Sequence, residues 1–257
     1  MVAPSPTVRP RVYWSVSGEA VVLKVSPDRS LIVAEAATLD VWRASGRVPE
    51  LFEFNDDSGA LLMEALRPGT ALTSGMKKSR LSEVVGLVRD LHAGADEAVL
   101  AGFPPLIERV EFIFQFWGKR LRKPEVAAVI PQDLPERSLA TARELATRPG
   151  LRVLLHGDLH LRNVLDGGFD RGLVAIDPRA CVGDPAFDLI DWVFADGGVT
   201  TIARRVGRLA EETAVDPASL WRWCERTAVL DATRLLTRGD GSADAVRSLL
   251  AFVENEV

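Results

Sequence analysis

Cysteine is nearly absent from this sequence. The 257 residues include 2 cysteines, Cys181 and Cys224, too few for a disulfide scaffold or a four-cysteine zinc site. The first residues, 1–7, lack the charged start and apolar run of a signal peptide. No apolar run approaches the length needed to cross a bilayer. We therefore expect a cytoplasmic protein with reduced thiols and no membrane partner.

Positive charge is also scarce. Lysine and arginine number 31 against 36 aspartates and glutamates, which gives a net charge of −5. A nucleic-acid binder needs a basic face, so no nucleic-acid partner is expected. The excess is local: residues 156–196 contain eight aspartates and three arginines, and the rest of the chain is balanced at 28 of each sign. The negative charge thus belongs to one short segment.

The first third of the chain shows strand patterns around one helix. Runs rich in β-branched and aromatic residues at 12–16 and 20–25 flank Ser17-Gly18 and predict a β-hairpin. Ser30 is the expected cap of a helix that runs to about Ala44. Two more strands are expected at 51–54 and 60–63, joined by a turn over 55–59. Arg67-Pro-Gly69 then marks a boundary between lobes.

The remainder of the chain is mainly helical in pattern. Apolar residues keep helical spacing near 81–92, 107–117 and, more weakly, 137–147. Short strands follow at 153–155, 163–165 and 173–176, and helices at 186–195, 200–213, 218–238 and 243–254. The sequence therefore predicts an α+β protein of two lobes. Residues 1–66 form a small β-rich lobe with one helix, and residues 67–257 form a larger, mainly helical lobe.

The segment His156-Gly-Asp-Leu-His-Leu-Arg-Asn163, followed by Ile176-Asp177-Pro178, carries the chemistry. It fits H-x-D-L-x-x-x-N, the catalytic loop of phosphoryl transfer, with glycine where protein kinases have arginine. In that reaction an Asp accepts the proton of the acceptor hydroxyl, while an Asn and a second Asp hold Mg²⁺. Asp158 and Asn163 share one loop, and a hairpin turning at Gly167-Gly168 would return Asp177 beside Asn163.

The amino-terminal lobe supplies complementary parts. Lys24, in Val22-Leu-Lys-Val25, matches the strand lysine that contacts nucleotide phosphates. Glu35 lies in the first turns of the next helix and is the expected partner of that lysine, with Glu19 and Asp40 as alternatives. Glu64 and Leu66 end a strand before the boundary, where an adenine ring would bond to backbone groups.

With these motifs the sequence resembles the aminoglycoside phosphotransferases, small-molecule kinases with a protein-kinase-like fold. It most resembles the streptomycin and hydroxyurea phosphotransferase branch. The resemblance rests on the ordered set HGDLHLRN, AIDP and GDPAFDL, and covers most of residues 20–195. It implies a cytoplasmic kinase that uses ATP or GTP with Mg²⁺ and phosphorylates a hydroxyl of a small molecule.

The resemblance also implies a role for each matching residue. Asp158 would be the catalytic base, and Asn163 and Asp177 the Mg²⁺ ligands. Lys24 with Glu35 would clamp the phosphates. His156 would pack under the catalytic loop, and Asp188 would brace it. The kinase glycine loop G-x-G-x-x-G is absent, with only Gly18 in the expected hairpin. Without this loop, nucleotide binding could be weaker than in the family. One alternative to a kinase is therefore a nucleotide-binding module that has lost catalysis.

Other residues have plainer interpretations. His156 and His160 are four residues apart, but HGDLH is not the metal-binding H-E-x-x-H and no G-N-H motif follows. A metal-dependent phosphoesterase is therefore the weaker alternative. Asp166 and Asp170 flank a glycine pair and are expected to be solvated turn residues.

The acceptor is harder to infer. A cleft that is lined by several aspartates suits a cationic acceptor, such as an aminoglycoside or amino sugar. Hydroxyurea is neutral and would need no such charge. Asp191 and Asp196 are candidate contacts for an amine or guanidino group of the acceptor. Asp191 has the alternative of facing solvent on its helix.

Overall fold

The structure is a computed structural model that describes residues 11–14, 20–72, 79–195, 201–239 and 242–254. The chain forms two compact units. The first unit combines Met1–Gly102 with Asp158–Ala180, and the second unit combines Phe103–Gly157 with Cys181–Val257. Each unit is thus built from two separate stretches of chain. The predicted lobe boundary after Leu66 stays a prediction, because a division by contacts need not coincide with a division into kinase lobes.

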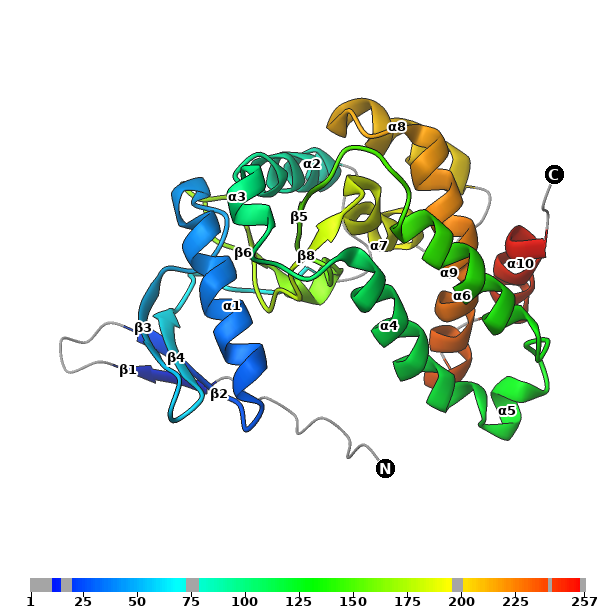
Figure 1. Ribbon diagram of the computed structural model, residues 1–257, viewed down its shortest axis with the longest axis horizontal. Coiled ribbons are helices and arrows are strands. Elements are labelled where there is room, and N and C mark those ends of the chain that lie inside the picture. Colours follow the sequence, from blue (N-terminus) through cyan, green and yellow to red (C-terminus); the bar gives the residue numbers. More distant parts are fainter. Residues whose placement is uncertain (1–10, 15–19, 73–78, 196–200, 240–241, 255–257) are drawn as a thin grey trace. The chain divides into compact units, whose positions relative to one another are not determined.

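An antiparallel sheet forms the amino-terminal part of the first unit, with strand order β1-β2-β4-β3 (Figure 1). Its valine-rich second strand suits a pleated, half-buried surface. The turn before the last strand is fixed by Asn55, whose side chain accepts a hydrogen bond from the Ser58 backbone N–H at 2.8 Å. The strands are β1 (Arg11–Trp14), β2 (Ala20–Val25), β3 (Leu51–Asn55) and β4 (Ala60–Glu64).

Helix α1 (Arg29–Trp42) packs against β3 and β4. Its buried residues recur at helical spacing, and Glu35 is one of them. The expected cap at Ser30 is wrong: the helix begins at Arg29, so Asp28 is the N-cap residue. Ser30 instead lies in the first turn and donates to the Asp28 carboxylate at 2.6 Å. A short 3₁₀ helix, η1 (Arg43–Ser45), ends at Gly46 with φ +67°.

The hairpin of β6 (Val164–Asp166) and β7 (Leu173–Ala175) belongs to the first unit because the chain after β4 pairs with it. Leu72 donates its backbone N–H to Val164 at 3.0 Å, and Asp166 donates to Thr70 at 2.9 Å. These bonds tie the predicted catalytic segment to the sheet. The unit also holds helices α2 (Ser79–His92), α3 (Glu97–Leu100) and the 3₁₀ helix η2 (Leu161–Asn163).

Helix α9 is the centre of the second unit and contacts the surrounding helices α4, α5, α6, α7, α8 and α10. Its buried residues include Trp223, which stacks edge-on against Phe187. The helices are α4 (Leu106–Leu121), α5 (Pro124–Ala127), α6 (Leu134–Ala146), α7 (Ile190–Phe194), α8 (Ile202–Thr213), α9 (Pro217–Arg238) and α10 (Ala243–Glu254). None of the helices in the described ranges is long and apolar enough to span a bilayer.

A second small sheet pairs β5 (Val153–Leu155) with β8 (Cys181–Gly183), a strand that the pattern did not predict. The 3₁₀ helix η3 (Pro185–Leu189) follows directly. Asp184 caps it by accepting from the Ala186 backbone N–H at 2.9 Å, and Pro185 opens its first turn.

Candidate active site

Lys24 is the charged centre of the first unit. It is 4% exposed, and it is the buried residue of β2, next to the end of that strand. Its Nζ atom is 2.5 Å from Glu35 Oε2 on α1 and 2.5 Å from Asp177 Oδ1 after β7. Glu19, an alternative partner, lies outside the described residues, whereas Asp40 pairs with Arg43 at 2.9 Å. The structure therefore brings three predicted site residues to one point.

The Lys24–Glu35 pair is buried, with Glu35 3% exposed. Burial raises the pKa of Glu35 above its ordinary value, and the neighbouring Lys24 opposes that rise. A buried carboxylate of this kind needs its cation. Lys24 is thus held in place from the α1 side, while Asp177, with a side chain 39% exposed, is the more accessible partner.

Asp158 and Asn163 are also joined. Asn163 Nδ2 donates to the Asp158 backbone oxygen at 3.0 Å and to its carboxylate Oδ2 at 3.2 Å. Asn163 is buried, but the Asp158 side chain is 34% exposed. His160 Nε2 lies 3.9 Å from the same carboxylate oxygen, and its Nδ1 accepts from the Arg162 backbone. The loop therefore fixes Asp158 while leaving part of its carboxylate open to solvent.

The β6–β7 hairpin places Asn163 and Asp177 beside each other, as the spacing predicted. Asn163 directly precedes β6, and its backbone oxygen accepts from Ile176 at 2.9 Å. Asp177 follows one residue later with φ +56°, in the left-handed region. Such a conformation is uncommon for a residue other than glycine and is often found at functional sites.

A cavity of about 170 Å³ lies next to these residues, within the first unit. Lys24, Glu35 and Asp177 form its charged wall. Its other walls are mainly apolar and include Val22, Leu39, Met63, Leu165 and Ile176. The part of the cavity that the described residues enclose is smaller than the roughly 300–1,000 Å³ of whole ligand pockets. The cavity therefore suits part of a nucleotide, such as the flat base, better than a whole nucleotide.

Glu64 and Leu66 both line this cavity, but their backbones differ. The Glu64 N–H donates to Glu50 at 2.9 Å and is not available to a ligand. Its carboxylate accepts from Arg171, a residue that the motifs did not single out. Within the described ranges, the N–H and C=O of Leu66 have no hydrogen-bond partner. Of the two candidates, Leu66 is thus the better placed to bond a base.

Arg171 is a residue next to the candidate site that the sequence patterns missed. Besides Glu64, it donates to the backbone oxygens of Gly46 and Val48, at 3.1 Å and 2.7 Å from Nη2. It therefore ties the β6–β7 loop to the wall of the cavity. Its only sequence feature is its place in the acidic segment, where it is one of three arginines.

Asp188 lies in the second unit and is 3% exposed. Its carboxylate accepts from the backbone N–H groups of His156 at 2.7 Å and Gly157 at 2.8 Å. His156 is completely buried, and Gly157 has φ +73°. Arg109 donates to the Gly157 oxygen at 2.6 Å. These bonds hold the residues that directly precede Asp158 in the chain.

The remaining aspartates of the acidic segment have mixed outcomes. Asp170 is exposed, as expected of a turn residue. The same expectation for Asp166 is wrong: it is half-buried and pairs with Arg80 at 2.5 Å, which helps to lower its pKa. Asp191 is exposed on α7. Asp196 lies outside the described residues.

The site residues fit a magnesium nucleotide. Mg²⁺ is usually held by one or two protein carboxylates with phosphate oxygens and water, and Asn163 and Asp177 offer oxygens of this type. In the described part of the chain, no group of three or more His, Cys, Asp and Glu side chains is arranged to hold a metal. A two-residue magnesium site completed by phosphates needs no such group. Lys24 is a cation of the kind that binds nucleotide phosphates.

Comparison with known proteins identifies the family of this chain. The model of the aminoglycoside/hydroxyurea antibiotic resistance kinases matches residues 5–239. The chain is 32% identical over 199 residues to streptomycin 6-kinase of Streptomyces griseus, covering 74% of this chain and 61% of that protein. It is 32% identical over 180 residues to hydroxyurea phosphotransferase of Kitasatospora aureofaciens, covering 67% and 49%. The chain thus spans about half to three fifths of these relatives.

Solved structures show the same fold. Choline kinase LicA from Streptococcus pneumoniae has a TM-score of 0.63 at 12% identity, covering 95% of this chain and 88% of that one. A thermostable mutant of aminoglycoside phosphotransferase APH(4)-Ia, in a ternary complex with AMP-PNP and hygromycin B, has a TM-score of 0.61 at 20% identity, covering 100% and 93%. The kinase-like α+β fold expected from the motifs is confirmed. Together with the family match over most of its length, this shows that the chain belongs to the aminoglycoside/hydroxyurea antibiotic resistance kinases.

Proposed function

We propose that this protein transfers the γ-phosphate of ATP to a hydroxyl group of a small molecule. The observation that carries the proposal is the double pairing of Lys24 with Glu35 and Asp177 at 2.5 Å each. The Asp158–Asn163 pair lies in the same unit. These are the residue types that phosphoryl transfer uses for phosphate binding, magnesium binding and proton acceptance.

Each residue then has one task. Bound Mg·ATP supplies the phosphoryl group and neutralises charge on the phosphates. Asp158 accepts the proton of the acceptor hydroxyl and orients its oxygen. Asn163 and Asp177 would hold Mg²⁺. Glu35 positions Lys24, which would bind phosphate oxygens, and Leu66 would bond the base through its backbone. Asp188 braces the residues before Asp158.

The acceptor is proposed from the relatives. One acts on streptomycin and another on hydroxyurea, as their names state. Streptomycin is a polycation, so an acidic contact such as Asp191 would favour it over a neutral acceptor. We therefore propose streptomycin or a related amino sugar as the first acceptor to test, and hydroxyurea as the second.

The test is a screen for Mg·ATP consumption with streptomycin, other aminoglycosides, amino sugars, hydroxyurea and simple sugars. Asp158→Asn serves as the blank. Asp170→Asn is the matched control, because it makes the same change at an exposed position of the same segment. We expect Asp158→Asn to lower turnover by at least about 10²-fold, the usual contribution of a positioned acid or base. Asp170→Asn should leave turnover unchanged.

Nucleotide binding separates the role of Asp158 from general damage. A thermal-shift titration with Mg·ATP should give nearly the same midpoint for Asp158→Asn and the wild type. Wild-type turnover by Asp158→Asn on an accepted substrate would show that the base is assigned to the wrong residue. Binding of Mg·ATP without transfer to any acceptor would favour a nucleotide-binding module that has lost catalysis.

A further inference from the structure

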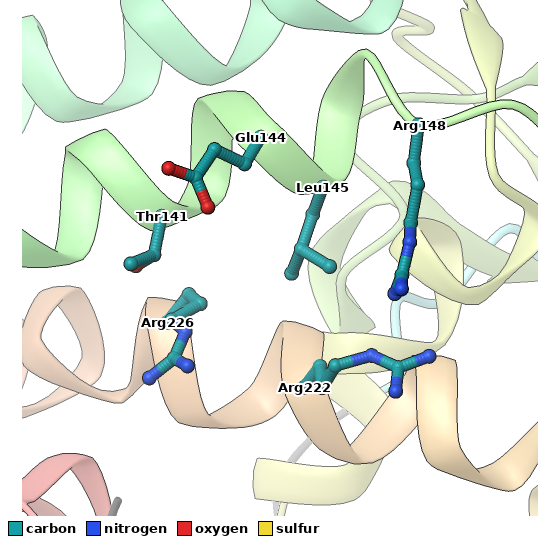
Figure 2. A pocket seen from close by; sticks show the side chains of 6 residues that line it. All are labelled: Thr141, Glu144, Leu145, Arg148, Arg222 and Arg226. Atoms are coloured by element: carbon teal, nitrogen blue, oxygen red, sulfur yellow. The ribbon is translucent and has the colours of Figure 1, made fainter.

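A second cavity, of about 370 Å³, lies in the second unit between α6 and α9. Thr141, Glu144 and Leu145 come from α6, Arg148 from the segment just after it, and Arg222 and Arg226 from α9 (Figure 2). Its volume lies within the roughly 300–1,000 Å³ typical of small-molecule pockets. None of its lining residues belongs to the proposed phosphoryl-transfer site.

The lining of this cavity is strongly basic. Three arginines and one glutamate give it a formal charge of +2, although the whole chain carries −5. Figure 2 shows the Arg148 side chain reaching from the end of α6 toward α9, where Arg222 and Arg226 lie. Like charges that share one cavity repel each other, and an anion between them would remove that cost.

The two arginines nearest the end of α6 are poorly neutralised. Among the described residues, the Arg148 guanidinium has no hydrogen bond or ion pair. Arg222 Nη2 is 3.6 Å from Asp216, whose carboxylate already caps α9 through the N–H groups of Ala218 and Ser219. In the described part of the chain, the Arg222 Nε atom is buried without a hydrogen-bond partner. A cation with an unpaired buried donor is costly, so an acceptor bound at the 38% exposed remainder of the Arg222 side chain would offset part of that cost.

We propose that the cavity between α6 and α9 binds a phosphate group, either as a free anion or as part of a phosphorylated small molecule. A guanidinium group can donate two parallel N–H hydrogen bonds to two oxygens of one phosphate, so arginines are well suited to such a site. A single phosphate leaves part of the volume for a second phosphate or an organic body. Leu145 and the Thr141 side chain line the region of the cavity next to Glu144, and this region suits the organic body of a phosphorylated molecule.

The experiment is isothermal titration with inorganic phosphate, pyrophosphate and glycerol 3-phosphate, in the absence of Mg²⁺ and nucleotide. We expect saturable binding of at least one probe by the wild type. Arg148→Gln and Arg222→Gln should each weaken it about tenfold, the loss of one charged hydrogen bond. Glu144→Gln should tighten it severalfold, because it removes the only negative charge of the lining. Tighter binding of glycerol 3-phosphate than of phosphate would identify a phosphorylated molecule as the source.

Two controls locate the binding. Arg137→Gln removes an arginine from the same helix α6, where it pairs with exposed Asp133 outside the cavity, and should leave binding unchanged. Lys24→Met tests whether the probes bind instead at the phosphoryl-transfer site. The proposal would be overturned if Lys24→Met lost binding while Arg148→Gln bound the probes as tightly as the wild type. Equal weakening by Arg137→Gln, or the absence of binding by any of the three probes, would also overturn it. Arg148 is exposed, so its variant is expected to fold even if Arg222→Gln does not.

Discussion

The acidic segment from residue 156 to 196 divides between the two units, and its aspartates are stabilised in different ways on either side of the division. In the first unit two of them pair with cations, Asp177 with Lys24 and Asp166 with Arg80. In the second unit two of them accept hydrogen bonds from neutral groups. Asp188 accepts from two backbone N–H groups, and Asp184 accepts from Ala186, Ser219 and the Trp223 indole.

This difference separates exchangeable from permanent interactions. A carboxylate paired with a lysine can change partners when a metal and phosphates arrive, because the charges of the ligand replace those of the pair. A carboxylate that satisfies buried backbone N–H groups cannot leave without exposing them as unpaired donors. The comparison predicts that loss of Lys24 in the first unit lowers activity as well as stability, whereas loss of a carboxylate that serves backbone N–H groups in the second unit mainly lowers stability.

The largest expected effect is that of Lys24→Met. Turnover should fall by about 10²–10³-fold, the usual cost of removing one positioned charge-stabilising group. The free energy of unfolding should fall by about 3–5 kcal/mol, because Glu35 loses its cation while buried. The double variant Lys24→Met/Glu35→Gln should regain most of that stability and none of the activity. Steady-state kinetics and urea unfolding measure the two effects.

The pH dependence of Lys24→Met follows from the raised pKa of Glu35. A carboxyl group whose pKa is raised by folding stabilises the protein below its unfolded value and loses that contribution as the pH rises. The stability deficit of the variant should therefore shrink as the pH falls toward 4.5, the ordinary value of Glu35. Arg43→Met removes a cation from the exposed pair with Asp40 and should cost below about 1 kcal/mol. Turnover of Lys24→Met within a few-fold of the wild type would contradict the comparison.

The second effect is that of Asp188→Ala, which should lower the free energy of unfolding by about 2–4 kcal/mol. It leaves the N–H groups of His156 and Gly157 buried and unpaired. Urea unfolding midpoints at neutral pH measure the loss. Glu211→Ala, at an exposed position of α8, is the matched control and should change the midpoint little. Equal effects of the two substitutions would mean that Asp188 does not brace the loop.

Much of this arrangement was predictable from local patterns. The β-branched residues of the run at 20–25 predicted β2, and the distance from Asn163 to Asp177 predicted a hairpin that sets them side by side. Asp184 and Pro185 are residue types typical of a helix start, and they open η3. These features depend on residues that are close in sequence, where spacing and turn chemistry decide the structure.

Partners from distant parts of the chain were not predictable in this way. Arg80 and Asp166 are 86 residues apart, and Arg171 and Glu64 are 107 apart. The three arginines of the α6–α9 cavity come from α9 and from the segment just after α6, and no motif encodes how these two parts pack. Strand β8 has three residues and is defined by its pairing with β5, which a pattern in one short run does not reveal.

The smallest expected effect is that of Asp166→Asn, and its pH dependence separates an ion pair from a neutral hydrogen bond. The Arg80 guanidinium holds the pKa of Asp166 below its ordinary value of 3.8, and the Gly168 N–H contributes to the same shift. A carboxyl group whose pKa is lowered by folding stabilises the fold when the pH is above its pKa in the unfolded chain. It loses that contribution as the pH falls through its pKa in the folded protein.

In the wild type the Gly168 N–H donates to the Asp166 carboxylate at 2.9 Å, and the asparagine keeps an oxygen that can accept the same bond. The variant therefore removes the charge and leaves the turn intact. The difference in unfolding free energy should be about 0.2–1 kcal/mol at neutral pH. It should shrink once the pH falls below 3.8 and vanish below the lowered pKa of folded Asp166. A difference that persists in acid would mean that Asp166 acts through neutral hydrogen bonds, like the aspartates of the second unit.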